Sequence, residues 1–145
     1  MSAAAHDQAR NLDIDALFQR ATEATEHAYA PYSHLHVGAA LLTSAGHVIT
    51  GSNLENASYG STICAERVAV GRAVAEGHRQ FQAIAVAIES QTDWVSSGVC
   101  CGSCLQVLAE FAPQGDLLVI FPQGHSLQVA CLSDLIPVRF TAADS

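Results

Sequence analysis

The sequence predicts an α/β fold in which helices pack on a mixed five-stranded sheet. An amphipathic helical pattern lies near the N-terminus, two strand-like segments flank a short turn after it, and "AIAVAI" is a continuous apolar run typical of a strand buried on both faces. The predicted elements follow the order α-β-β-α-β-α-β-β, which is expected when helices cover a sheet. At 145 residues the chain is expected to form one domain over 1–145, with residues 1–11 as a flexible N-terminal tail.

The first three elements are expected before residue 53. Apolar residues recur at helical spacings over residues 12–29 with charges between them, and Asp13 is the candidate N-cap. Pro31 ends this pattern, because proline cannot continue a helix. Two strands follow at residues 37–42 and 47–52, and the Ser-Ala-Gly turn between them indicates a hairpin.

The second helix is expected to begin at Ser61 or Thr62 and to end at Gly77, which is the candidate C-cap. A polar loop, "SQTDWVSSGVC", separates the strand that follows from the third helix, and Pro113 ends that helix. The remaining elements are a buried strand, the third helix, two further strands and a short terminal helical turn, expected at residues 83–88, 102–112, 116–121, 125–132 and 133–137.

The composition argues against two classes of partner. The formal net charge is −8 with only six Lys plus Arg residues, whereas proteins that grip a phosphate backbone need a basic cluster. No apolar run approaches the ~20 residues of a membrane span. The N-terminus also lacks the charged and apolar regions of a secretory signal. We therefore expect a cytoplasmic protein that binds neither nucleic-acid polymers nor membranes.

The five cysteines are expected to serve a metal or a reaction, because their count is odd and a reducing cytosol disfavours disulfides. Three of them, Cys64, Cys101 and Cys104, lie where a loop or strand turns into a predicted helix. Unpaired backbone N–H groups and the helix dipole favour thiolates at such positions. Three protein ligands with a fourth position left for water is the arrangement of catalytic zinc.

Two charged residues follow the first of these cysteines. Glu66 lies two positions after Cys64, where it can move a proton beside the metal without being a ligand. Three thiolates on a dipositive ion leave the site with a net negative charge, which weakens zinc as a Lewis acid. Arg67 is expected to compensate for this thiolate charge by donating hydrogen bonds to the sulfurs.

Other interpretations of these residues stay open at this point. The cysteines can be a buried structural cluster, since free cysteine often packs as a small apolar residue. The chain can also be a non-catalytic zinc protein, although such a protein has no use for Glu66 beside an open metal position. A third interpretation is a thiol oxidoreductase that uses the C-x-x-C pair, and its zinc content would distinguish it.

Three segments together resemble one known family. "PYSHLHVGAALL", "GSNLENASYGSTICAER" and "CGSCLQVLAEF" are similar to segments of the small, tetrameric, three-cysteine cytidine deaminases, in the same order and over about residues 13–140. The resemblance implies a three-layer α-β-α sandwich and a homotetramer with one Zn²⁺ per chain. It also implies hydrolytic deamination of cytidine or deoxycytidine at C4 of the base, with release of ammonia, in pyrimidine salvage.

The resemblance further assigns roles to individual residues. Cys64, Cys101 and Cys104 would bind zinc, and Glu66 would carry the proton. Asn53 and Glu55 match the pair that holds the ribose hydroxyls, by donating to them and accepting from them. The remaining substrate contacts that it implies are Leu35, Ala65 and, from a neighbouring subunit, the aromatic Phe140.

The chain departs from the family's pattern at three positions. Cys100 stands where the family usually has proline, Leu105 where it has arginine, and Leu35 where it has an aromatic residue in the pocket wall. A smaller Leu35 makes room for a bulkier substrate, and Trp94 in the polar loop is a candidate stacking surface. The substrate alternatives are therefore a modified cytidine, another aminopyrimidine nucleoside or an antibiotic such as blasticidin S. For Cys100 we expect a packing role.

Overall fold

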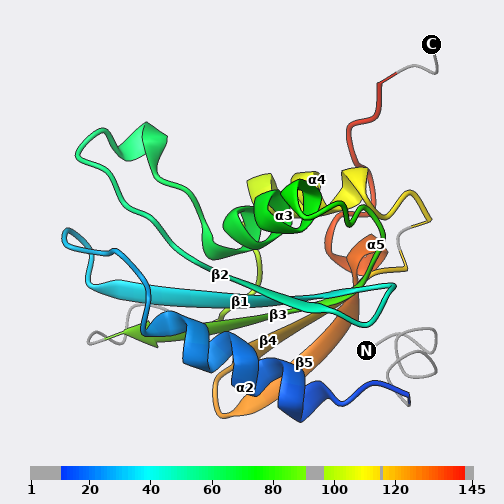
Figure 1. Cartoon of the computed structure of the whole chain (residues 1–145), viewed down its shortest axis with the longest axis horizontal. Helices are drawn as coiled ribbons and strands as arrows, with labels where there is room; N and C mark the ends of the chain where they lie inside the picture. Colours follow the sequence, from blue (N-terminus) through cyan, green and yellow to red (C-terminus); the bar gives the residue numbers. More distant parts are fainter. Residues whose placement is uncertain (1–10, 91–96, 115, 143–145) are drawn as a thin grey trace.

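The structure, a computed structural model, describes residues 11–90, 97–114 and 116–142. The strands of these segments form one sheet in the order β2-β1-β3-β4-β5, in which β3 and β4 run parallel and the other neighbours antiparallel (Figure 1). The strands are β1 (Leu35–Thr43), β2 (Val48–Ser52), β3 (Phe81–Ser90), β4 (Leu118–Gln123) and β5 (Ser126–Cys131). The predicted mixed five-stranded sheet is confirmed.

Helices cover both faces of the sheet. The helical segments are α2 (Ile14–Thr25), the 3-10 turn η1 (Tyr59–Ser61), α3 (Ala65–Ala75), α4 (Gly102–Glu110) and α5 (Leu132–Leu135). In Figure 1, α2 crosses one face, whereas α3 and α4 lie against the other. Two separate groups of buried side chains fill the two interfaces, with Leu17 and Ala40 on the α2 side and Leu41 and Leu108 on the α3 and α4 side. The expected three-layer α-β-α sandwich is therefore confirmed.

A glycine in β2 lets α3 approach the sheet closely. A Cβ atom at Gly51 would come within 2.4 Å of the Ala65 carbonyl oxygen and 2.5 Å of the Ala69 amide nitrogen. No side chain fits there, because real Cβ atoms stay at least about 3 Å from backbone atoms. The first turn of α3, which follows Cys64, is therefore held directly on β2.

Two predicted helix boundaries are wrong by three or more residues, and the contacts of Leu54 explain both. Leu54 forms a parallel bridge with Tyr29 and an antiparallel bridge with Ile63. The first bridge draws the chain out of the first helix, which ends at Thr25 instead of residue 29. The second keeps Ile63 extended, so the second helix begins only at Ala65. Bridges between segments far apart in sequence override the local helical pattern here.

Asp13 is the N-cap of α2 as predicted, whereas the C-cap of α3 is Glu76, one residue before the predicted Gly77. The Asp13 side chain accepts a hydrogen bond of 3.0 Å from the Ala16 amide, and Gly77 follows α3 with φ +91°, which favours glycine. Trp94 and residues 1–10 lie outside the described residues. Within the described residues, none of the helices has the length and apolar character needed to cross a membrane.

Candidate metal centre

The three cysteines singled out from the sequence come together between two helix N-termini. Cys64 is the N-cap of α3, Cys101 is the N-cap of α4, and Cys104 lies in the first turn of α4. Their Sγ atoms all lie within 4.8 Å of one another, and Cys101 Sγ is 3.6 Å from Cys104 Sγ. Sulfurs bound to one tetrahedral zinc at about 2.3 Å would be about 3.8 Å apart. The cluster therefore fits a zinc ion.

The cluster favours a thiolate at Cys64. Its pKa falls to about 5, mainly because the Cys104 thiol donates a hydrogen bond to it and also because Arg67 is close. Cys104 keeps its proton in this pair, and its pKa is raised by the same hydrogen bond and by burial. A zinc ion binds thiolates, so its binding would release the proton that the two sulfurs share.

Arg67 contacts the cluster through Cys64. Its Nη2 atom donates to Cys64 Sγ at 3.8 Å and to the Thr62 carbonyl oxygen at 3.2 Å. The hydrogen bond to Cys64 raises the pKa of the guanidinium further. Arg67 Nε is buried without a hydrogen-bond partner among the described residues. The guanidinium thus brings positive charge directly beside the sulfurs.

Glu66 is a buried carboxyl group next to the cluster. It lies in the first turn of α3 and is only 5% exposed. Burial raises its pKa, and the negative charge of Cys64 adds to this effect. Within the described residues, Glu66 is not part of the metal-ligand cluster. A carboxyl group whose pKa is raised in this way holds a proton more readily, so it can take up a proton and give it back during a reaction.

Cys100 and Leu105 are buried beside the same helix start. The Cys100 side chain is 3% exposed and packs in the apolar core, and its thiol donates a hydrogen bond to the Glu66 carboxyl group. Burial, followed by the nearby Glu66 charge, raises the pKa of Cys100 well above its usual range. Cys100 therefore stays a thiol outside the three-sulfur cluster. Leu105 is a core residue.

Asn53 holds the beginning of β1 in place. Its Nδ2 atom donates to the Leu35 carbonyl oxygen at 2.8 Å, and its Oδ1 atom accepts from the Val37 amide at 2.9 Å. The side chain is 8% exposed. Leu35 is half-buried, and its own amide donates to Ser33 Oγ at 3.1 Å. The backbone of Leu35 is therefore tied on both sides.

Glu55 closes the turn before β1. Its carboxylate accepts hydrogen bonds from the Tyr32 amide at 2.9 Å, from the Ser33 amide at 3.3 Å and from the Ser33 hydroxyl. The hydroxyl contact is the main reason why the pKa of Glu55 is lowered. Ser33 is not among the residues predicted from the sequence, although it lies in the segment "PYSHLHVGAALL". Its local signal is weak, because serine occurs in many turns.

Of the other candidate positions, Ala65 lies directly after a cluster cysteine, whereas Phe140 lies at the surface. Ala65 is fully buried at the start of α3, between Cys64 and Glu66. The Phe140 ring is 79% exposed on this chain. His34 and His36 line a separate cavity of about 300 Å³.

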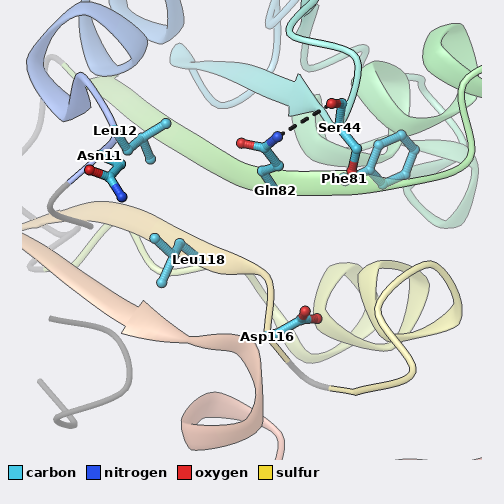
Figure 2. A pocket seen from close by; sticks show the side chains of 7 residues that line it. All are labelled: Asn11, Leu12, Ser44, Phe81, Gln82, Asp116 and Leu118. Atoms are coloured by element: carbon cyan, nitrogen blue, oxygen red, sulfur yellow. Dashed lines mark hydrogen bonds between the residues drawn. The ribbon is translucent and has the colours of Figure 1, made fainter. Parts of the chain in front are cut away.

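A cavity of about 370 Å³ lies at a different part of the molecule. It is lined by Asn11, Leu12, Ser44, Phe81, Gln82, Asp116 and Leu118, and none of the cysteines reaches it (Figure 2). It lies at the amino ends of the parallel strands β3 and β4, whereas ligands in α/β sheets bind at the carboxyl ends. The three-sulfur cluster, which follows the carboxyl end of β3 through α4, remains the candidate site.

Comparison with known proteins agrees with this site. The pattern of the cytidine and deoxycytidylate deaminase zinc-binding region matches residues 12–119. A cytidine deaminase of Halalkalibacterium halodurans is 43% identical over 133 residues, which cover 92% of this chain and 98% of that protein. The crystal structure of a cytidine deaminase from Burkholderia pseudomallei superimposes with a TM-score of 0.79 at 41% identity, covering 89% of this chain and 100% of that one.

A protein named for a different substrate is also similar. A blasticidin-S deaminase of Bacillus cereus is 31% identical over 129 residues, which cover 86% of this chain and 90% of that protein. The resemblance inferred from the motifs is confirmed by these matches, which span nearly the whole chain. The chain belongs to the family of deaminases that carry the cytidine and deoxycytidylate deaminase zinc-binding region.

Proposed function

We propose that the chain catalyses the hydrolytic deamination of cytidine and deoxycytidine to uridine and deoxyuridine, with release of ammonia. The observation that carries the proposal is the buried Glu66 carboxyl group beside three clustered cysteine sulfurs. The relatives named cytidine deaminases, at 43% and 41% identity, support the same reaction. The enzyme would be a hydrolase of C–N bonds in cyclic amidines.

Cys64, Cys101 and Cys104 would hold one zinc ion per chain through their thiolates. When bound, zinc supplies Lewis-acid chemistry that makes water a nucleophile at neutral pH. Arg67 would withdraw part of the thiolate charge through its hydrogen bond to Cys64, so that three negative ligands do not quench this chemistry. Cys100 would stay outside the metal site.

Glu66 would move the proton during the reaction. A carboxylate oxygen of Glu66 takes a proton from the attacking water and gives it to N3 as the C–O bond forms at C4 of the pyrimidine. The same carboxylate then carries the remaining hydroxyl proton to the departing nitrogen, so that a carbonyl forms at C4. The C4–N bond breaks and ammonia leaves. The burial that raises the pKa of Glu66 supports this role, because the group must hold the proton between the two transfers.

Glu55 would bind a sugar hydroxyl while Asn53 supports the pocket wall. The Glu55 carboxylate is exposed and accepts three hydrogen bonds, and two carboxylate oxygens offer about four acceptor positions. Both polar atoms of Asn53 already bind the β1 backbone, although its amide nitrogen carries a second hydrogen for a hydroxyl. Ala65 would contact the base with its amide, which has no acceptor within α3.

We further propose a cytoplasmic homotetramer in which Phe140 covers the base in a neighbouring subunit. The exposed ring on this chain is consistent with such a contact. A group of exposed apolar side chains near the turn before β1 also suits a subunit interface: Tyr29, Tyr32, Leu54, Tyr59 and Ile63.

A bulkier aminopyrimidine nucleoside, such as blasticidin S, is the second candidate substrate. Leu35 in the proposed pocket wall favours this bulkier substrate, because leucine leaves more room than an aromatic ring. The similarity to a blasticidin-S deaminase supports the same alternative. A non-catalytic zinc protein is a weaker alternative, since a buried Glu66 carboxyl group has no role there.

The test is an assay of the purified protein with its zinc content measured. Cytidine, deoxycytidine and blasticidin S are incubated separately, and conversion is followed by mass. We expect chelator-sensitive conversion of the first two and about one zinc per chain, with Glu66→Gln keeping zinc and losing activity by about 10²–10⁴-fold. A zinc-loaded wild type that converts only blasticidin S would favour the second substrate. A Glu66→Gln variant with near-normal turnover would remove Glu66 from the mechanism.

A further inference from the structure

The segment after α5 presents apolar side chains to solvent at a defined place. Residues 136–142 form neither helix nor strand, and the chain rises past α4 toward its C-terminus (Figure 1). Val138 is 91% exposed and Phe140 is 79% exposed. Burial of these side chains therefore contributes almost nothing to holding the segment.

Gln106 holds the backbone of Phe140 instead. Its Nε2 atom donates to the Phe140 carbonyl oxygen at 2.9 Å, and its Oε1 atom accepts from the Phe140 amide at 3.1 Å. The amide side chain thus satisfies both polar groups of one backbone residue. A glutamine amide can do this because it carries a donor and an acceptor side by side.

Arg139 attaches the same segment to the residues that follow the C-terminal end of α4. Its Nη1 atom donates to the Ala112 carbonyl oxygen at 3.0 Å, and its Nη2 atom donates to the Pro113 carbonyl oxygen. These carbonyls follow the last residues of the helix, where acceptors lack intrahelical partners. The segment is therefore fixed at the middle of α4 and just beyond the C-terminal end of that helix.

The same helix carries two of the three clustered sulfurs. Cys101 caps α4, and Cys104 lies two residues before Gln106. Because a helix is rigid over so short a distance, the contact between Gln106 and Phe140 sets the place of the exposed ring relative to the cluster. The two residues are 34 positions apart in sequence.

We propose that Gln106 is a positioning residue for nucleoside binding, which holds the Phe140 backbone so that its ring can cover the base in a neighbouring copy's site. This inference rests on the proposed deaminase function. Gln106 does not touch the reacting atoms. Its loss would free the ring and weaken nucleoside binding, while zinc binding and the chemical step would remain.

The first test compares Gln106→Met with Gln19→Met. Methionine keeps the length of the side chain and removes both hydrogen bonds. Gln19 is a matched glutamine on α2 whose side chain donates to Glu23. In the zinc-loaded protein, Gln106→Met should raise KM for cytidine about tenfold, as two lost hydrogen bonds allow, with kcat within about twofold. Gln19→Met should change neither. An unchanged KM, or a fall in kcat and zinc content instead, would overturn the positioning role.

A double variant separates positioning from a general structural role. Phe140→Ala should raise KM by a similar factor, and adding Gln106→Met to it should cause no further loss, because the ring is already gone. If the two effects multiply, Gln106 acts independently of Phe140 and the proposal is wrong. An inactive but zinc-loaded wild type would instead count against the proposed function itself.

Trypsin gives a readout that does not depend on activity. All six basic residues of the chain are arginines, and cleavage after Arg139 removes residues 140–145. In the zinc-loaded protein, Gln106→Met should be cut at this bond several times faster than the wild type, as mass spectrometry of the intact chain would show. Equal rates would mean that Gln106 does not hold the segment.

Discussion

Arg67 Nη2 lies 3.8 Å from Cys64 Sγ and donates at the same time to the Thr62 carbonyl oxygen at 3.2 Å. The second hydrogen bond fixes the guanidinium just before the α3 N-terminus, where the helix dipole also favours negative sulfur. The guanidinium of Arg67 and the dipole of α3 therefore both stabilise a thiolate at Cys64. This arrangement allows the cluster to bring three sulfurs together within 4.8 Å.

Replacing Arg67 by glutamine should weaken zinc binding about tenfold or more, as the loss of a residue that bonds a metal ligand usually does. The pKa of Cys64 should rise in this variant, so protons would compete with zinc up to a higher pH. Competition with a chromogenic chelator at several pH values would measure this effect. Arg72→Gln is the matched control, because Arg72 bonds Thr50 in β2. Equal zinc affinity in both variants would contradict the role of Arg67.

Glu66→Gln should stabilise the metal-free protein at neutral and alkaline pH. The folded-state pKa of Glu66 is raised above 4.5, so the folded protein binds more protons than the unfolded chain and its stability falls as pH rises through that window. Glutamine removes this penalty. Melting temperatures of the two metal-free proteins should differ at pH 8 and converge near pH 4. A difference that does not depend on pH would mean that burial of the charge is not the cause.

Glu55→Gln should raise KM for cytidine about tenfold, if the carboxylate accepts a sugar hydroxyl in a charge-assisted hydrogen bond. Ser33→Ala is the comparison, because it removes one protein donor from Glu55 and leaves the carboxylate in place. It should raise the pKa of Glu55 and change KM much less. Steady-state kinetics of both variants would decide, and a larger loss for Ser33→Ala would assign Glu55 to the turn alone.

Cys100→Ala should leave about one zinc per chain and shift the pH profile. The Cys100 hydrogen bond lowers the pKa of Glu66, so its removal should raise that pKa and move the acid limb of kcat/KM to higher pH. Cys131→Ala is the control, because Cys131 packs in the core on the other face of the sheet. A loss of zinc in Cys100→Ala would place Cys100 among the ligands.

The metal centre could be predicted because its residues lie only two or three positions apart in sequence within each of two short motifs. Cys64 and Glu66 share one helix start, and Cys101 and Cys104 share another. Helix N-termini favour thiolates whatever the rest of the fold does. The layers of the sandwich could also be predicted, since the alternation of helical and strand patterns is local.

The contacts that hold the presumed substrate residues could not be predicted in this way. The Gln106 amide meets a backbone 34 positions away, and no pattern near either residue indicates the pair. Likewise, no local pattern indicates the bridges of Leu54 with Tyr29 and Ile63. Because of these bridges, the first helix ends and the second helix begins at other residues than predicted. The sugar contact of Asn53 stays a prediction, whereas its hydrogen bonds to Leu35 and Val37 follow from how far β1 extends, which the sequence pattern does not fix.

Leu35→Phe should shift substrate preference toward cytidine and away from blasticidin S. The Leu35 backbone is tied through its amide to Ser33 and through its carbonyl to Asn53, so a larger side chain should fill the pocket without moving the strand. A few added carbons in a pocket change discrimination by about 10–200-fold. The ratio of kcat/KM for the two substrates measures the shift. Leu127→Phe in β5 provides the control, and an equal ratio in all three proteins would place Leu35 outside the pocket.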